Sequence, residues 1–94
     1  MYEIVITSRF KKSFRKLRHS GKFGQAAQDD LANVMSLLAK RGKLPREYRD
    51  HQLSGEMARY RECHIKGDVL LLYNFDDIER VVVMNDIGSH SYLF

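Results

Sequence analysis

Val69-Leu70-Leu71-Leu72-Tyr73-Asn74-Phe75 is a nearly continuous apolar run, and it decides the fold. A run of this length without alternation is typical of a central strand that is buried on both faces. Turn residues bound it at 66–68 and at 76–77. The segments 58–65 and 78–84 on either side have strand-like patterns. We therefore expect the last third of the chain to form a mostly antiparallel sheet.

Residues 58–65 alternate with a period of two, which assigns neighbouring side chains to opposite faces of the sheet. One face receives Tyr60, Glu62 and His64, and the other receives Arg59, Arg61, Cys63 and Ile65. His51-Gln52-Leu53 precedes the turn residues Ser54-Gly55 and is predicted as a further short strand. Glu62 and His64 should then lie together on one face of the sheet.

The first half of the chain predicts a short strand at Tyr2–Ile6 and two amphipathic helices. Phe10, Phe14 and Leu17 form the apolar stripe of a helix at 9–19, which Thr7 and Ser8 can cap. A second helix is predicted from about Gln25 to Lys40, ended by Gly42 and Pro45. This order predicts an α+β fold, in which an N-terminal strand and an antiparallel helix hairpin on one face accompany a twisted sheet.

The length and composition of the chain indicate what kind of protein it is. The chain has 94 residues, of which 44% are hydrophobic and 30% charged, so we expect one folded domain over residues 1–94. Its single cysteine excludes an internal disulfide and fits a reducing compartment. No apolar run approaches the roughly 20 residues of a membrane span, and no signal-peptide core follows Met1. We expect a cytoplasmic protein that does not use a membrane.

The basic residues are concentrated in the first predicted helix. The net charge is +4, and residues 9–22 carry seven basic residues without one acid. Such a surface attracts RNA through counterion release, and it equally suits an acidic protein partner or a solvated helix face. The residues at issue are Lys11, Lys12, Arg15 and Lys16.

Three of the four histidines, His51, His64 and His90, lie in the last third of the chain, where Glu62 and Asp68 accompany them. Imidazoles and carboxylates supply both partners of proton transfer near neutral pH. The spacings match no usual zinc motif, so we expect no metal and no cofactor. Cys63 is expected to be a small buried residue and not a nucleophile.

Metal-free cleavage of RNA suits this set of residues. Such a reaction needs a base for the ribose 2′-hydroxyl, an acid for the leaving oxygen, and donors that stabilise charge at phosphorus. Histidine serves either proton-transfer role. The aromatic side chains of Tyr92 and Phe94 can stack on a base.

Three segments resemble the YafQ branch of the RelE/ParE toxin superfamily. They are Tyr48-Arg49-Asp50-His51-Gln52-Leu53-Ser54-Gly55, Tyr60-Arg61-Glu62-Cys63-His64, and Gly88-Ser89-His90 with the terminal Leu93-Phe94. The resemblance covers essentially the whole chain. It implies a bacterial type II toxin that cleaves mRNA in the ribosomal A site and is neutralised by a cognate antitoxin.

Carried over residue by residue, the resemblance makes His51, His64, Asp68 and His90 catalytic. Phe94 would help to position the substrate. Glu62 and Arg61 of the matching segment are further candidates for substrate binding, and the charge of the first helix adds Lys11, Lys12, Arg15 and Lys16 to them. The transfer is least secure for Glu62, where relatives can carry Asp.

Two positions depart from the family pattern. Asp86 stands where the family often has Arg, and Val69 stands where an aromatic residue often follows the Asp. Exchanging a cation for an acid near the scissile phosphate should weaken transition-state stabilisation by about 2–4 kcal/mol. Two alternatives therefore stay open. One is a toxin of the same fold that binds a protein target such as DNA gyrase, and the other is a weakened member that retains antitoxin binding.

Overall fold

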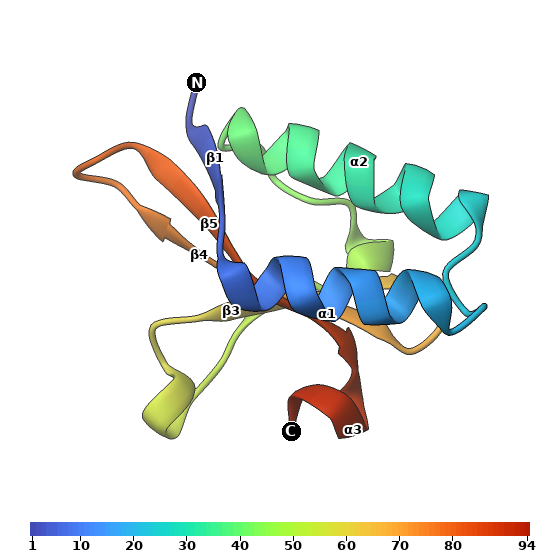
Figure 1. Ribbon diagram of the computed structural model, residues 1–94. Helices are drawn as coiled ribbons and strands as arrows, with labels where there is room; N and C mark the ends of the chain where they lie inside the picture. The colour runs from blue at the N-terminus through green and yellow to red at the C-terminus, as the bar shows by residue number, and fades with distance from the viewer.

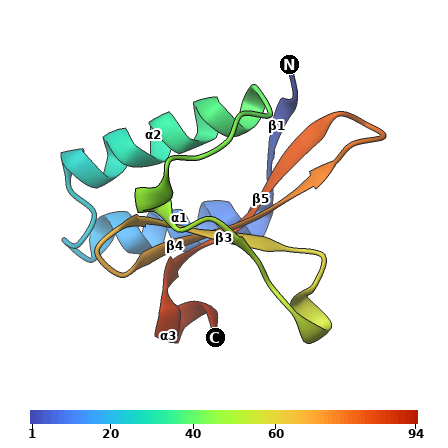
Figure 2. The same cartoon turned by 180° about the vertical axis from the view of Figure 1, so that it is seen from behind.

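The computed structural model describes residues 1–94, which form a five-stranded sheet with two long helices on one side (Figure 1). Seen from behind, the short C-terminal helix lies at the end of the last strand, away from the second long helix (Figure 2). No helix is long and apolar enough to cross a membrane. The elements are β1 (Glu3–Ile6), α1 (Ser8–His19), α2 (Gln25–Ala39), η1 (Arg46–Tyr48), β2 (His51–Gln52), η2 (Gly55–Met57), β3 (Arg61–Lys66), β4 (Val69–Asp76), β5 (Val81–Ser89) and α3 (His90–Leu93).

The strands lie in the order β1-β5-β4-β3-β2, so the apolar run is the central strand, as predicted. The neighbours β2–β3, β3–β4 and β4–β5 are antiparallel, whereas β1 is parallel to β5. The predicted α+β fold with a mostly antiparallel sheet is therefore confirmed. The two strands of the parallel pair are the first and the last of the chain, and both helices and three strands separate them in the sequence.

Thr7 fixes the start of α1 against β5. Its hydroxyl accepts a hydrogen bond from the Phe10 amide at 3.0 Å and donates to the backbone oxygen of Asn85 at 2.9 Å. The first bond is the N-cap that the sequence predicted. The second joins the helix to the neighbouring strand, so α1 lies along β5 with Phe10 buried beneath it.

A left-handed residue ends α2. The amide of Arg41, with φ 57°, bonds to the Leu38 oxygen, and the Gly42 amide bonds to the Leu37 oxygen, both at 2.9 Å. This pair of bonds defines a Schellman motif. The stop lies where the sequence predicted it, but Arg41 and not the glycine takes the left-handed position.

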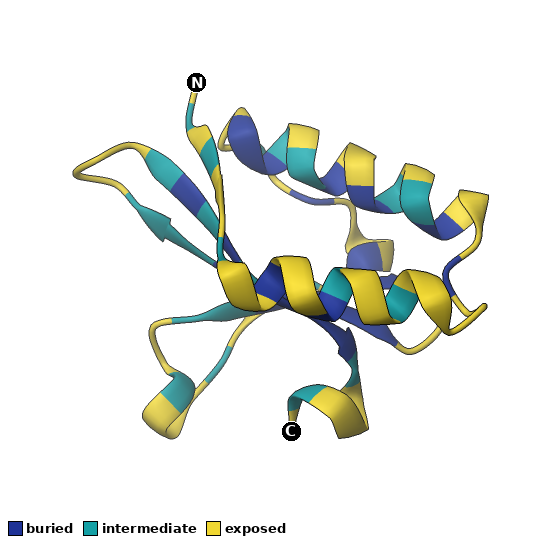
Figure 3. Ribbon diagram, viewed as in Figure 1, coloured by how far each residue is buried: buried dark blue, intermediate teal, exposed yellow.

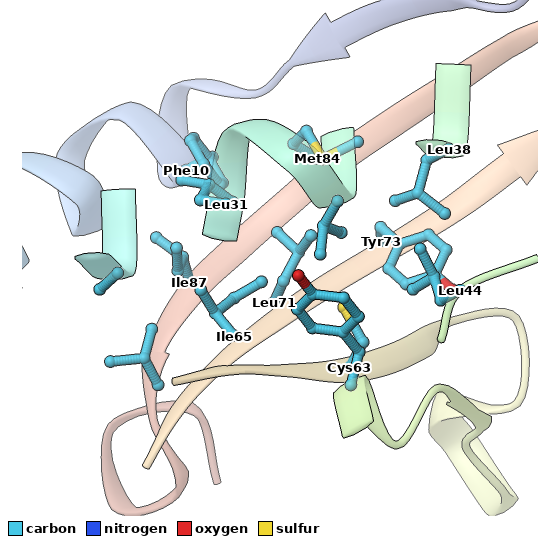
Figure 4. Packing of buried hydrophobic residues seen from close by; sticks show 14 of the residues in the cluster. Phe10, Leu31, Leu38, Leu44, Cys63, Ile65, Leu71, Tyr73, Met84 and Ile87 are labelled. Atoms are coloured by element: carbon cyan, nitrogen blue, oxygen red, sulfur yellow. The ribbon is translucent and has the colours of Figure 1, made fainter. Parts of the chain in front are cut away.

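The core lies between the helices and one face of the sheet. Figure 3 shows the buried residues of α2 on its inward side, and Figure 4 shows the side chains that meet them. Leu31 and Leu38 of α2 are in the same cluster as Cys63, Leu71 and Tyr73 of the sheet. Because side chains alternate along a strand, the neighbours of these sheet residues point to the other face.

Several strand boundaries differ from the prediction, most of all those of β3 and β5. β3 begins at Arg61 and not at 58, because Gly55 (φ 64°) opens a turn in which the Tyr60 amide bonds to the Met57 oxygen at 2.9 Å. β5 begins at Val81 and not at 78, because Arg80 is left-handed (φ 57°) and Ile78 is 92% exposed in the turn. β5 also continues to Ser89, beyond the predicted end at 84.

A bulge at Asn85 explains the unexpected length of β5. Leu72 pairs with Asp86 and Tyr73 with Met84, so Asn85 is the extra residue on β5. Because one residue is inserted, Met84 and Ile87 both enter the core. Asp86 consequently faces the side of the sheet away from α1 and α2.

Candidate active site

The face of the sheet away from α1 and α2 carries His51, Glu62 and His64, and we call it the histidine face. His51 pairs with Glu62 in the β2–β3 register, and the His51 Nε2 atom lies 3.4 Å from Glu62 Oε1. The rings of His51 and His64 have centroids 6.4 Å apart. The sequence prediction that Glu62 and His64 share a face is therefore correct.

Backbone and carboxylate oxygens hold the His51 ring at both nitrogens. Nδ1 lies 2.8 Å from the backbone oxygen of Arg49, a residue that is left-handed with φ 47°. Nε2 faces the Glu62 carboxylate, whose side chain is only 8% exposed. Oxygen atoms on both sides therefore fix the orientation of the ring.

His90 and Phe94 form a second group, on α3. Their rings have centroids 5.3 Å apart, and both residues are exposed. His90 is the first residue of α3, which Ser89 caps by accepting a hydrogen bond from the Tyr92 amide. It lies at the surface.

Leu70 and Leu72 form the apolar floor between these two groups. His64 pairs with Leu70, and Leu70 pairs with Gly88, two residues before His90. Two strand spacings, about 10 Å, therefore separate the His64 backbone from that of β5. Both leucines are buried although they point away from the main core.

Asp68 lies apart from the group of His51, Glu62 and His64. It is exposed in the turn between β3 and β4 and lines a cleft of about 410 Å³ together with Lys16, Ser89 and Tyr92. No hydrogen bond or ion pair joins it to a histidine. The structure thus brings His51, Glu62 and His64 together and places Asp68 beside α3.

Asp86 is a second buried acid on the histidine face. It pairs with Leu72, which in turn pairs with Glu62, so Leu72 separates the two carboxylates along one row of the sheet. Asp86 Oδ1 accepts a hydrogen bond from the Ile87 amide at 2.9 Å. The sequence identified this residue as a departure from the family pattern, and its burial on this face makes the departure relevant.

Arg61 is on the opposite face of β3 from Glu62. Its Nη2 atom donates to Asp50 Oδ2 at 2.8 Å and its Nε to Asp50 Oδ1 at 3.3 Å, while the Tyr73 hydroxyl also donates to Asp50. The hydrogen bond to Asp50 raises the pKa of Arg61, and burial raises the pKa of Tyr73. Sequence analysis did not single out Asp50 or Tyr73 as partners, and their only signal was a charge beside His51 and a tyrosine in an apolar strand.

Cys63 is fully buried on the helix side of β3. Burial raises the pKa of its thiol to about 12, so the thiol stays protonated at neutral pH. This agrees with the expectation that Cys63 is a packing residue. In addition, no three of the His, Cys, Asp and Glu side chains converge in a way that would hold a metal ion.

The four predicted basic residues of α1 divide between two surfaces. Lys11 and Arg15 border a groove of about 550 Å³ between α1 and α2, whose floor includes Phe10 and Leu31. Lys16 is on the other side of α1, with its Nζ 5.6 Å from the centroid of the Tyr92 ring. Lys12 is exposed.

The fold corresponds to that of a class of small bacterial toxins. A copper-bound mutant toxin from Helicobacter pylori superposes over 100% of both chains with a TM-score of 0.88 and 36% identity. In the DinJ–YafQ complex from Escherichia coli, a chain that is 25% identical superposes with a TM-score of 0.83, covering 100% of this chain and 99% of that one.

Sequence comparison narrows the class. The mRNA interferase toxin YafQ of Escherichia coli K12 is 28% identical over 90 residues, which is 85% of this chain and 96% of that protein. Residues 2–94 match the family described as the bacterial toxin of a type II toxin-antitoxin system, YafQ. The chain belongs to this family.

Proposed function

We propose that this protein is an mRNA interferase that cleaves mRNA in the ribosomal A site by metal-free general acid–base catalysis. The observation that carries the proposal is the His51–Glu62–His64 group, which lies on the exposed side of the sheet. Membership of the YafQ toxin family and the mRNA interferase named among its relatives support the same activity.

Each group on this face has a chemical task in RNA cleavage. An imidazole takes the proton of the ribose 2′-hydroxyl, and a second one protonates the departing 5′-oxygen, so the two roles fall to His51, His64 and His90. The Glu62 carboxylate orients the His51 ring. Phe94 stacks on a base beside His90 and thereby positions the substrate.

Asp68, Arg61 and the basic residues of α1 take supporting parts in this proposal. Asp68 acts from the cleft beside α3, where it meets the substrate next to His90. Arg61 contributes by holding Asp50, which directly precedes His51. Lys11, Lys12, Arg15 and Lys16 bind ribosomal RNA through its phosphates.

Asp86 limits the rate of the proposed reaction. Its buried carboxylate faces the side on which negative charge develops at phosphorus, and Arg61 is on the other face, paired with Asp50. Loss of a cation at such a site costs about 2–4 kcal/mol of transition-state stabilisation. Slow cleavage compared with relatives that carry Arg is therefore the expected behaviour.

A cognate antitoxin is the second partner that we propose, because the DinJ–YafQ complex contains a structurally similar chain. The net charge of +4 favours an acidic partner. Since the proposed substrate is mRNA on a translating ribosome, the protein acts in the cytoplasm.

The deciding experiment incubates the antitoxin-free protein with ribosomes that are programmed with a defined mRNA, and maps the cleavage products by primer extension. Wild-type protein should cleave in the A-site codon, equally with and without EDTA. His64→Ala should lose at least a hundredfold in rate, since a general acid or base supplies about 10²–10⁴. His19→Ala is the matched control, because His19 is on α1 and far from the histidine face.

The alternatives make different predictions in the same assay. Absence of cleavage by a folded protein that still binds its antitoxin would identify a catalytically weakened member, for which Asp86 is the reason. Absence of cleavage with inhibition of DNA gyrase supercoiling would identify a toxin that binds a protein target. Activity that EDTA abolishes would refute the metal-free mechanism alone.

A further inference from the structure

Helix α3 carries His90 and Phe94, yet it has only four residues, His90–Leu93. Isolated helices of this length do not form in water, because nucleation fixes several residues before one hydrogen bond is gained. Tertiary contacts must therefore hold it. The Ser89 cap fixes its first turn only relative to β5.

Tyr92 supplies the contact between α3 and the rest of the molecule. Its hydroxyl lies 3.0 Å from the Ser13 hydroxyl of α1, a side chain from a part of the sequence 79 residues away. Ser13 is only 2% exposed, and Tyr92 is the partner of its hydroxyl. A buried hydroxyl without a partner is unfavourable, so this bond holds α3 against α1.

Gly88 makes room for the Tyr92 ring. A Cβ at position 88 would lie 2.6 Å from Cδ2 of Tyr92 and 3.3 Å from its Cγ. The ring therefore packs directly on the backbone of β5. Lys16 covers it at 5.6 Å from the centroid, so contacts with two elements, α1 and β5, fix the position of this side chain.

Because Tyr92 and His90 belong to the same short helix, fixing the position of Tyr92 also sets the orientation of His90. Residues two apart in a helix are about 200° apart around its axis, whereas residues four apart share a side. Tyr92 thus anchors one side of α3 to α1, and His90 with Phe94 is turned to the other side.

We propose that Tyr92 and Ser13 form a positioning pair that sets the orientation of His90 and Phe94 for cleavage. The proposal rests on the function proposed above and deepens it, because neither residue touches the reacting atoms. A displacement of about 1 Å of a reacting group can cost about a hundredfold in rate. Loss of the pair should therefore lower kcat and leave KM for the ribosome unchanged.

The first test uses Tyr92→Phe and Ser13→Ala, which each remove one hydroxyl. We expect each variant to lose roughly 10- to 100-fold in kcat with an unchanged KM and an unchanged antitoxin affinity. Ser36→Ala is the matched control, since Ser36 is exposed on α2, away from the histidine face and α3. Hydrogen exchange of the Phe94 amide, which bonds to the His90 oxygen at 2.9 Å, gives a readout that does not depend on activity. It should become faster in both variants.

The second test couples Gly88 with Tyr92. Gly88→Ala should displace the ring and lower kcat, whereas the same change in a Tyr92→Ala background should have no further effect, because the added methyl group then meets no ring. Additive losses would overturn the proposal, as would wild-type kcat together with unchanged amide exchange in Tyr92→Phe. If the wild-type protein does not cleave mRNA, the proposed function fails, while the exchange data still decide whether Tyr92 holds α3.

Discussion

Asp50→Asn should destabilise the protein by an amount that the structure allows us to work out. The Asp50 carboxylate accepts two hydrogen bonds from Arg61, at 2.8 and 3.3 Å, and one from the Tyr73 hydroxyl. A hydrogen bond to a charged group contributes about 1.5–3 kcal/mol, and partial exposure of this pair reduces that figure. An amide retains one acceptor oxygen but loses the charge. The net loss should be about 2–3 kcal/mol.

Thermal unfolding followed by circular dichroism measures this loss. For a domain of this size, 1 kcal/mol corresponds to about 4–8 °C, so Tm should fall by roughly 10–20 °C. Cleavage should fall as well, because Asp50 precedes His51 in a strand of only two residues. Asp77→Asn is the matched control, since Asp77 pairs with Arg41 at 3.3 Å on an exposed surface and its loss should leave Tm nearly unchanged.

A change in Tm of less than 2 °C for Asp50→Asn would refute this reasoning. Equal effects of the Asp50 and Asp77 variants would refute it too, because burial of the network would then have no energetic consequence. Tyr73→Phe serves as an internal calibration. It removes one of the three bonds and should cost about 0.5–1.5 kcal/mol.

Three further predictions concern other parts of the molecule. His90→Ala should change Tm by less than about 2–4 °C, because His90 is exposed. It should slow mRNA cleavage at least a hundredfold. A variant that cleaves at the wild-type rate would show that His90 is not catalytic. Cys63 in the native protein should react with iodoacetamide at pH 8 at least a hundredfold more slowly than in guanidinium chloride. The reason is that burial raises its pKa to about 12, and the thiolate is the reactive form. Mass spectrometry measures both rates, and equal rates would contradict the burial of Cys63. Exchanging all four basic residues of α1 for Gln should flatten the salt dependence of ribosome binding, and an unchanged slope would show that this surface is merely solvated. These four residues are Lys11, Lys12, Arg15 and Lys16.

The sequence predicted the elements whose apolar residues repeat regularly. The stripe of Phe10, Phe14 and Leu17 located α1, and the run from Val69 to Phe75 located the central strand. Period-two alternation correctly placed Glu62 and His64 on one face. Such patterns succeed because burial of one face is the dominant local constraint.

The predicted strand boundaries are wrong where the residues do not follow this regular pattern of burial. Ile78 is apolar, but it is exposed to solvent in a turn. The predicted strand therefore began at residue 78, whereas β5 begins at Val81. The bulge at Asn85 interrupts the alternation, so Asp86 and Gly88 had no pattern that assigns them to β5. Tertiary pairing, which the local sequence does not encode, decides both cases.

The sequence identified residues of the candidate site but did not show which of them lie close together. Sequence reasoning named His51, His64, Asp68 and His90 as one set, and it could not place Asp68 in the cleft beside α3. It also could not pair Arg61 with Asp50, because that contact depends on how β2 meets β3 and β4. Distances between side chains on different strands require the register.

The parallel pairing of β1 with β5 has a consequence for biosynthesis. Ile6 finds its partner Met84 only after roughly 80 more positions have been translated, which takes about 4–16 s at ordinary rates of synthesis. Until then the nascent chain has no complete sheet, and the strand that leads to His90 has not been made. The ribosome therefore completes this chain before the proposed site can form.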